Sequence, residues 1–364
     1  MRVSPVTSSR PLHDRPWLPR RVIVTRSARG FAHGRMIVER AERLGIDVVA
    51  LPGDRLSLNV PEDPRRAYAE AKATLAIVVA PPSKRRLQPI APSADWRVDL
   101  AEGCPAHCSY CYLAGSLKGP PITRVYANLD EILSSLPAYL GQGTITSRKA
   151  DRAGEGTTFE ASCYTDPLVL EPLTGSLSTA IGWFGQWEAE AQLRFTSKFA
   201  DVTPLLDIAH RGRTRMRASL NPRAYARFEG GTAPVSARLH AIRRMADAGY
   251  PIGLTIAPII AADGWQDAYG ALIDDVAAEL AGTEALDLTV ELITHRYTTR
   301  SKAVLDSWYP GSALDMSSRN RVTKRTKFGT EKQVYDPATM RDLRTFFERR
   351  IADALPGARI LYWT

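Results

Sequence analysis

Three of the chain's four cysteines lie close together, at Cys104, Cys108 and Cys111, in the pattern C-x3-C-x2-C. Thiolates are soft ligands that suit iron, and three of them can hold three irons of a [4Fe–4S] cube. The fourth iron would then have no protein thiolate and would stay open to a small ligand. The pattern therefore predicts a cofactor-binding loop, and the fold must hold that loop at a site open to a second molecule.

Two other interpretations of the cysteines are open. A structural zinc site needs four ligands, and His107 could be the fourth, but its place between two of the cysteines strains a tetrahedral arrangement. A disulfide plus one odd thiol is the other, although nothing else in the chain looks secreted. The small number of cysteines and their clustering favour a reducing, cytoplasmic location.

The composition allows a large soluble enzyme with an acidic partner. The chain has 364 residues, 44% of them hydrophobic, which is enough for one large domain or a domain with a smaller one attached. No run approaches the roughly 18 apolar residues of a membrane span, and the Pro- and Arg-rich start has no signal-peptide core. The net charge of +9 favours nucleic acid as a partner, although a general Arg-rich bias would give the same charge.

Changes in sequence pattern divide the chain into four parts. We predict a disordered leader (1–20), an N-terminal α/β unit (21–90), a partial barrel (91–297) and a C-terminal region with a basic hairpin (298–364). In the N-terminal unit we expect strands at 21–25, 46–51 and 74–79 and helices at 34–44 and 61–72. The unit has neither G-x-G-x-x-G nor a P-loop, so the sequence assigns no nucleotide to it.

Six strands alternate with helices after this unit, and this order predicts a (β/α)6 partial barrel with a parallel sheet. The expected strands are 96–100, 157–162, 192–196, 215–220, 252–256 and 288–292. The expected helices are 129–140, 173–184, 202–210, 235–248 and 265–280, followed by a helix at 337–354 and a strand at 358–363.

The fourth cysteine, Cys163, ends the second barrel strand, while the three-cysteine loop follows the first. Active sites of such folds lie at the carboxyl ends of the strands, so we expect all four thiols at one mouth. A thiol there could donate a hydrogen atom, because S–H bonds are weaker than most C–H bonds. A lone cysteine is more often a small buried hydrophobic residue.

The cysteine spacing followed by an aromatic residue is typical of radical S-adenosylmethionine (SAM) enzymes. Together with the motifs at 159–163, 194–199, 291–296 and 358–364, it resembles the spore photoproduct lyase family. The resemblance runs from about residue 21 to the C-terminus. It implies a [4Fe–4S] cluster, SAM, and repair of 5-thyminyl-5,6-dihydrothymine in UV-damaged DNA through a 5′-deoxyadenosyl radical.

The resemblance also implies roles for individual residues. Cys163 falls on the family's hydrogen-atom donor, and Tyr110 and Tyr112 fall on tyrosines thought to return the radical to SAM; shielding of the cluster would explain them equally well. The positions that match SAM contacts are Lys198, Ser219, Thr165 and Asp166. A surface lysine, a turn hydroxyl and a helix cap are the simpler interpretations of Lys198, Ser219 and Asp166.

A basic run near the C-terminus corresponds to a family hairpin that contacts DNA. Its candidate DNA-binding residues are Lys324, Arg325, Lys327, Phe328 and Lys332, with Tyr335 beside them. Basic side chains next to an aromatic ring suit phosphate contact and base stacking, although a solvated charged loop has the same composition. Glu160 and His295 are weaker candidates for the pocket wall.

The chain departs from the family at Lys327, Phe328 and Tyr164, where Arg, Tyr and a small hydroxyl residue are usual. Lys327 lacks the bidentate fork of Arg. These changes concern the lesion more than the radical chemistry. A family enzyme for another nucleic-acid lesion and a non-catalytic iron–sulfur DNA-binding protein are therefore the alternatives. We expect a monomer that takes electrons from a donor such as flavodoxin or ferredoxin.

Overall fold

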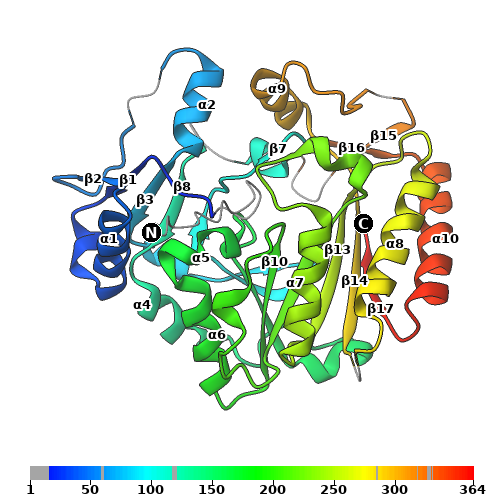
Figure 1. Ribbon diagram of the computed structural model, residues 1–364, viewed down its shortest axis with the longest axis horizontal. Helices are drawn as coiled ribbons and strands as arrows, with labels where there is room; N and C mark the ends of the chain where they lie inside the picture. Colours follow the sequence, from blue (N-terminus) through cyan, green and yellow to red (C-terminus); the bar gives the residue numbers. More distant parts are fainter. Residues whose placement is uncertain are drawn as a thin grey trace, which may run out of the picture.

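A computed structural model describes residues 16–58, 61–116, 121–283, 286–317, 319–325, 329 and 331–364. Its larger sheet has eight strands in the order β17-β14-β13-β11-β10-β9-β5-β4 (Figure 1). The strands are β4 (Gln88–Ile90), β5 (Ala94–Val98), β9 (Thr157–Ala161), β10 (Ala191–Ser197), β11 (Thr214–Leu220), β13 (Ile252–Ile259), β14 (Leu288–Thr294) and β17 (Arg359–Trp363).

The pairs from β5 to β17 are all parallel, and only the edge strand β4 is antiparallel. Apolar residues on these strands are buried, as a parallel sheet covered by crossover helices requires. The six predicted strands are therefore confirmed as the centre of a curled α/β sheet, and β17 adds a seventh parallel strand.

Helices cover the outer side of this sheet (Figure 1). They are α5 (Pro167–Thr174), α6 (Ser176–Gln186), α7 (Val235–Asp247), α8 (Trp265–Leu280) and α10 (Pro337–Ala354). The predicted helix at 173–184 is in fact two helices, because Gly175 adopts a left-handed conformation (φ 63°) that ends α5.

Two other predicted helices are wrong in extent. The helix expected at 129–140 stops as α4 (Leu129–Ser134) and continues as a 3-10 turn, since Pro137 has no N–H to continue the α-helix. The helix expected at 202–210 is only a 3-10 turn at Thr203–Leu205. His210 there accepts a hydrogen bond from the Gly212 N–H (3.0 Å), which favours a loop over a helix.

The N-terminal unit has the predicted alternation: β1 (Arg21–Val24), α1 (Ala32–Arg43), β2 (Asp47–Ala50), α2 (Pro64–Lys72) and β3 (Thr74–Val78). Its sheet has the order β2-β1-β3-β8-β6. Two of these strands, β8 (Thr123–Tyr126) and β6 (Ala101–Glu102), come from the sequence range of the predicted barrel. This unit and the barrel therefore share the chain around the cysteines, and the fourfold division of the chain stays a prediction.

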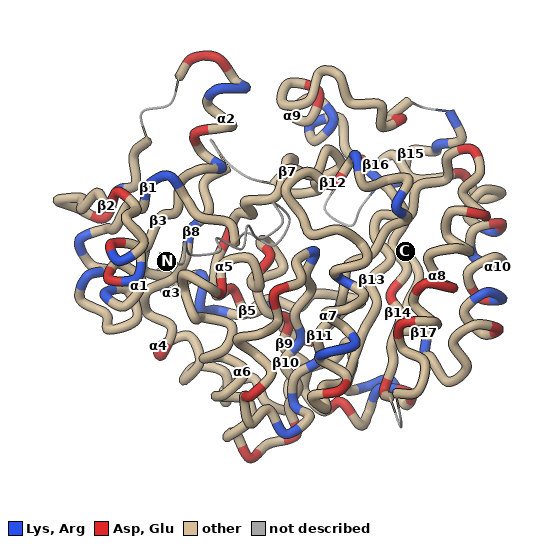
Figure 2. The backbone as a smooth tube through the Cα atoms, in the orientation of Figure 1, with Lys and Arg blue, Asp and Glu red and all other residues tan. Residues whose placement is uncertain are grey.

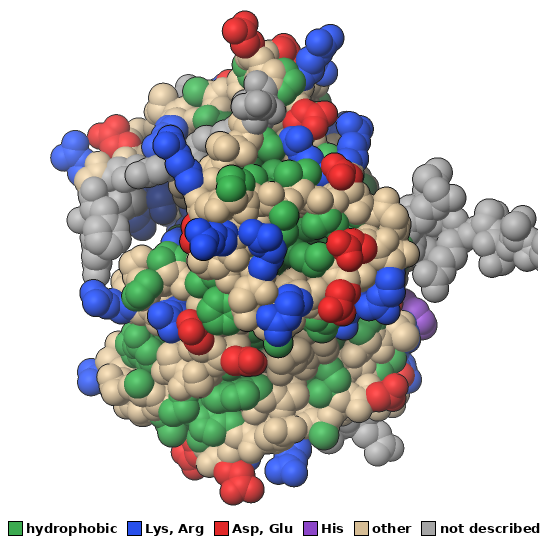
Figure 3. Space-filling model, turned by 90° about the vertical axis from the view of Figure 1, so that its left-hand side faces the viewer, with side chains coloured by type: hydrophobic (Ala, Val, Ile, Leu, Met, Phe, Trp, Pro, Cys, Tyr) green, Lys and Arg blue, Asp and Glu red, His purple; other side chains and the backbone are tan. Residues whose placement is uncertain are grey.

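Positive charge is not gathered in one place on the N-terminal unit. Figure 3 looks at the molecule from this side and shows Lys and Arg side chains mixed with Asp and Glu. The net charge of +9 thus marks no single anion-binding patch on this face.

The C-terminal region contains α9 (Thr299–Trp308) and the predicted hairpin, formed by β15 (Arg321–Arg325) and β16 (Glu331–Tyr335) in antiparallel register. Gln333 anchors this hairpin to the barrel, since its N–H donates to the Tyr297 oxygen at 2.8 Å. Lys and Arg residues mark both hairpin strands in Figure 2.

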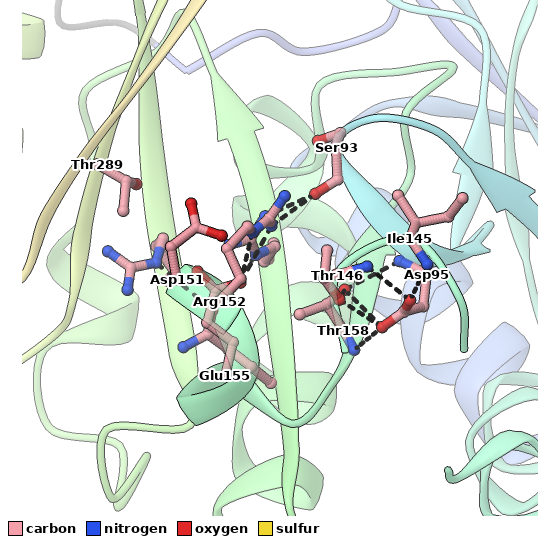
Figure 4. Close-up of polar contacts among 12 residues, drawn as sticks. Ser93, Asp95, Ile145, Thr146, Asp151, Arg152, Glu155, Thr158 and Thr289 are labelled. Carbon is pink, nitrogen blue, oxygen red and sulfur yellow. Dashed lines mark hydrogen bonds and ion pairs between the residues drawn. The ribbon is translucent and has the colours of Figure 1, made fainter. Parts of the chain in front are cut away.

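Buried polar side chains fix the amino ends of β5 and β9, the ends away from the turn that leads to Cys163 (Figure 4). Asp95 accepts hydrogen bonds from the N–H groups of Thr146 (2.9 Å) and Thr158 (3.1 Å). Arg152 donates to the Ser93 oxygen at 2.9 Å and pairs with Glu155 at 3.0 Å. Because this end is occupied by its own polar network, the opposite end is left for ligands.

Across the described ranges, the helices are all too short or too polar to span a bilayer.

Candidate functional site

The three-cysteine loop lies between the N-terminal unit and the barrel. It leaves β6 at Gly103, whose positive φ (78°) and close contact with the Ile122 oxygen leave no room for a side chain. The loop then forms β7 (His107–Cys108), which pairs antiparallel with β12 (Glu229–Gly230). The Ser109 N–H also donates to the Phe228 oxygen at 2.9 Å, so a distant barrel loop supports the cysteines from one side.

All three loop thiols are free and are at least partly shielded from solvent. Burial raises the pKa of the Cys104 thiol to about 11, although the positive charge of Lys72 opposes the rise. Burial also raises the pKa of Cys108, and Lys198 opposes that rise. The loop thus needs cations, or a metal centre, before its thiols can be thiolates.

The donor set fits a cluster better than a single ion. Among the described residues, no three His, Cys, Asp or Glu side chains converge closely enough to hold one metal ion. In a cube each thiolate binds a different iron, so wider spacing is expected. His107, the fourth ligand of the zinc alternative, instead bonds through Nδ1 to the Tyr68 hydroxyl (3.1 Å).

Glu229 is the centre of the ion pairs next to the loop, and no sequence motif selects it. Its carboxylate accepts from Lys198 (2.7 Å) and Asn221 (3.1 Å), pairs with Arg238 (2.6 Å) and accepts from the Tyr110 hydroxyl. It is 4% exposed. Although burial opposes ionisation, the adjacent Lys198 and Arg238 lower the pKa of this carboxyl to about 2. Glu229 is therefore a buried carboxylate that orients the predicted SAM contact Lys198 and the predicted relay Tyr110.

Asp166 is a helix cap, which is the simpler interpretation of this residue. It caps α5 by accepting from the Leu168 N–H (3.2 Å), and it also accepts from the Ser197 hydroxyl (2.9 Å) and the Lys198 N–H (2.7 Å). The carboxylate thus joins the ends of β9 and β10 and sets the position of Lys198. A direct contact between Asp166 and SAM stays a prediction.

The two hydroxyl residues among the predicted SAM contacts differ in their surroundings. Thr165 has a buried hydroxyl with no hydrogen-bond partner within the described part of the chain. Ser219 is the last residue but one of β11, and its main-chain oxygen accepts from Arg238 at 2.9 Å. An unsatisfied buried hydroxyl is costly unless a ligand pairs with it, so Thr165 is the one whose surroundings point to a ligand.

Cys163 is partly buried at the end of β9, where the chain turns sharply. The preceding Ser162 has a positive φ (55°), and its N–H donates to the Val98 oxygen (2.7 Å) while its hydroxyl accepts from the Leu100 N–H (3.0 Å). On the other side, the Tyr112 hydroxyl donates to the Cys163 main-chain oxygen. The residue is thus fixed by the strand that leads into the cysteine loop and by a residue of that loop.

Burial raises the pKa of the Cys163 thiol, and the negative charges of Asp99 and Glu160 act in the same direction, while Arg97 and Arg217 oppose the rise. Arg97 pairs with Asp99 (3.1 Å) and stacks on the ring of Tyr164 (4.5 Å), the aromatic residue that departs from the family. Burial and the two carboxylates favour the thiol, the form that can give up a hydrogen atom.

Glu160 and His295 are both buried and both engaged by arginines. Glu160 forms an ion pair with Arg217, which also pairs with Glu291 (2.5 Å). His295 accepts through Nδ1 from Arg321 at 2.9 Å, and burial followed by that arginine's charge lowers its pKa to about 3. A place for either side chain in the pocket wall stays a prediction.

The predicted DNA contacts are only partly described. Lys327 and Phe328 lie outside the described residues. Lys324 and Lys332 face each other across the hairpin, and Arg325 pairs with Glu331 at 3.4 Å. Two like charges directly opposite each other are unfavourable without an anion between them, which is consistent with a phosphate contact.

Sequence reasoning also missed Lys72, because it lies in a helix of the N-terminal unit with no motif around it. Its ammonium donates to the Ala106 oxygen (2.6 Å) and to the Cys104 oxygen. Lys72 thus contacts the cysteine loop from the N-terminal unit, whereas Glu229 reaches the loop from the barrel.

Comparisons with known proteins agree in one family. A family model described as "Spore photoproduct lyase" matches residues 17–364. The chain is 36% identical over 352 residues to the spore photoproduct lyase of a Geobacillus species, and this match covers 96% of the chain and all of the relative. It is 34% identical to the Bacillus subtilis enzyme, covering 96% and 99%.

Solved structures agree with the sequence matches. A spore photoproduct lyase double mutant with bound AdoMet and dinucleoside spore photoproduct superposes with a TM-score of 0.88 at 34% identity, covering 96% of this chain and 100% of that one. A second structure, complexed with the dinucleoside spore photoproduct, gives a TM-score of 0.88 at 35% identity with the same coverage.

Proposed function

This chain belongs to the spore photoproduct lyase family, and on that premise we propose that it reverses the spore photoproduct in UV-damaged DNA with SAM as co-substrate. The observation that carries the proposal is the match over 96% of the chain to an enzyme with AdoMet and the dinucleoside lesion bound. That match spans the whole length of the other chain.

We further propose that Cys104, Cys108 and Cys111 hold a [4Fe–4S] cluster. When bound and reduced, such a cluster supplies the electron that cleaves SAM to methionine and a 5′-deoxyadenosyl radical. The Lys198 ammonium would pair with the SAM carboxylate, and its bond to Glu229 (2.7 Å) would weaken as a result. The unsatisfied hydroxyl of Thr165 would complete its hydrogen bonding with the same ligand.

Cys163 is the proposed hydrogen-atom donor to the thymine radical that remains after the bridge between the two bases breaks. The donor must keep its proton until that moment, and both burial and the neighbouring carboxylates raise the thiol pKa. Tyr112 fixes the Cys163 main chain and, with Tyr110, is the proposed route that returns the radical to SAM. The hairpin residues Lys324, Arg325, Lys327, Phe328 and Lys332 would hold the DNA.

This activity implies a cytoplasmic enzyme with access to DNA and to a low-potential electron donor of the flavodoxin or ferredoxin class. We propose that the chain works as a monomer.

The test is anaerobic reconstitution with iron and sulfide, followed by reaction with dithionite, SAM and a dinucleotide spore photoproduct. We expect the repaired thymine dinucleotide together with 5′-deoxyadenosine. The Cys163→Ala variant should still cleave SAM but lose clean repair, whereas a Cys111→Ala variant should lose SAM cleavage as well.

Two other outcomes would redirect the assignment. SAM cleavage with an intact lesion would reject this substrate and lead to a screen of other lesion-bearing oligonucleotides; the Arg97–Tyr164 stack beside Cys163 is the feature that favours a different base there. The absence of 5′-deoxyadenosine under all conditions would indicate a non-catalytic iron–sulfur protein.

A further inference from the structure

The N-terminal unit contacts the cysteine loop through one face of α2. Tyr68 and Lys72 lie one turn apart on this helix and therefore point the same way. The Tyr68 hydroxyl bonds to His107 Nδ1 at 3.1 Å, and the Lys72 ammonium donates to the Ala106 oxygen at 2.6 Å and to the Cys104 oxygen. Asp63 fixes the start of the helix by accepting from the Arg66 N–H at 2.8 Å.

Lys72 is buried without an acidic partner. Its residue exposure is 6%, and lysine is almost never buried to this extent unless it is paired. Within the ranges that the structure describes, no carboxylate lies at ion-pair distance from its ammonium. Two main-chain oxygens satisfy two of its three N–H donors, but they do not neutralise its charge.

The Lys72 ammonium lies against the main chain of the cysteine loop, at the oxygens of Cys104 and Ala106. Thiolates on this loop would therefore bring negative charge close to it. A lysine held over an empty loop would be an unfavourable arrangement, whereas a lysine beside a thiolate-bound cluster is compensated. The position of Lys72 is thus explained by a negative centre bound to Cys104, Cys108 and Cys111.

We infer that Lys72 is a positioning and charge-tuning residue for the iron–sulfur cluster, through which the N-terminal unit favours the reduced state. Reduction adds one electron to a centre that already carries three thiolates. A fixed positive charge next to it stabilises the reduced form more than the oxidised form, and so makes the reduction potential less negative. The inference rests on the proposed function only in requiring that the cluster is bound.

Four variants separate the charge of Lys72 from its hydrogen bonds. Lys72→Met removes both, Lys72→Gln keeps a donor without the charge, and Lys72→Arg keeps both. Tyr68→Phe removes the adjacent bond to His107 at constant charge. Lys302→Met is the matched control, because it removes a half-buried lysine that has a carboxylate partner, Asp306 on α9.

The measurement is the midpoint potential of the reconstituted full-length protein, titrated anaerobically and followed by electron paramagnetic resonance of the reduced cluster. We expect a shift to more negative potential in Lys72→Met and Lys72→Gln. Lys72→Arg, Tyr68→Phe and Lys302→Met should titrate like the unmodified protein.

Unchanged potentials in Lys72→Met and Lys72→Gln at full iron content would overturn the inference and leave Lys72 as a loop anchor only. If those two variants lose iron while Lys72→Arg retains it, the charge requirement is supported at the level of cluster binding. If Lys72→Arg also loses iron, the charge role is rejected. None of these readouts uses the lesion, so a failure to repair the photoproduct would count against the proposed function alone.

Discussion

The Tyr112 hydroxyl donates its hydrogen bond to the main-chain oxygen of Cys163, which lies 51 residues further along the chain. The bond joins the cysteine loop to the residue proposed as the hydrogen-atom donor. Tyr112 is 63% exposed, whereas Tyr110 is buried and bonded to Glu229. The two tyrosines of the motif thus donate their hydrogen bonds to different residues.

Replacing Tyr112 with Phe should loosen the coupling between SAM cleavage and repair, because the Cys163 main chain loses one of its fixed contacts. We expect more SAM cleaved per lesion repaired, with a stability change of only about 1 kcal/mol. The two products are counted by chromatography in one reaction. Tyr139→Phe is the control, since its hydroxyl accepts from the Leu87 N–H (3.1 Å) away from the site; the same ratio in both variants would contradict a role for the Tyr112 bond.

Glu160 should make the fold less stable as the pH rises toward neutrality. Burial raises its pKa to about 7 from 4.5, although Arg217 opposes the rise. The folded state therefore holds this proton more tightly than the unfolded state. Its free energy of unfolding falls as the pH rises between the two pKa values, by up to about 1.4 kcal/mol per pH unit for one group. Above the higher pKa the loss of stability stops.

Glu160→Gln cannot ionise and should remove this contribution. The measurement is the denaturation midpoint between pH 5 and 8 for both proteins under anaerobic conditions. Asp166 has its pKa raised to about 6 by burial and acts in the same direction in both proteins. A stability difference between the two proteins that does not change over this range would contradict the prediction, because Glu160 would then contribute nothing to the pH dependence.

Lys332 should contribute one phosphate contact. It faces Lys324 across the hairpin, and burial together with Arg296 and Lys324 lowers its pKa, so a phosphate there would relieve the repulsion. Lys332→Gln should weaken the binding of lesion-containing DNA. It should also reduce the slope of log affinity against log salt concentration by about 1. Arg349→Gln removes an equal charge from an exposed site on α10 and should leave the slope as it is. Equal slopes in the two variants would place the DNA elsewhere.

The sequence predicted the barrel well because each buried parallel strand is a short apolar run, and it predicted the cysteine loop because its ligands are neighbours in the chain. It failed at 202–210, where a side chain of the loop competes with the helix. It could not select Glu229 or Lys72 either. Glu229 reaches the loop only through pairing of β12 with β7, and Lys72 only through the docking of α2. Both are ordinary charged residues until tertiary structure buries them.

Glu229 should be among the most sensitive positions for stability, because one carboxylate compensates both Lys198 (2.7 Å) and Arg238 (2.6 Å) in the interior. Removing one partner of a buried ion pair costs about 3–5 kcal/mol, since the remaining charge is left uncompensated. We expect Glu229→Ala to lose stability on that scale and Glu229→Gln to lose less, because the amide oxygen still accepts a hydrogen bond.

The comparison is with Glu279→Ala, which removes a carboxylate from a largely exposed pair with His240 (3.4 Å) and should have little effect. The stability of all three variants is compared through their denaturation midpoints. The Glu229 variants should also hold Lys198 less firmly and so raise the KM for SAM, which a loss of stability alone would not do at temperatures where the protein is folded. An unchanged KM in a folded Glu229→Gln variant would mean that Lys198 reaches its position without this carboxylate.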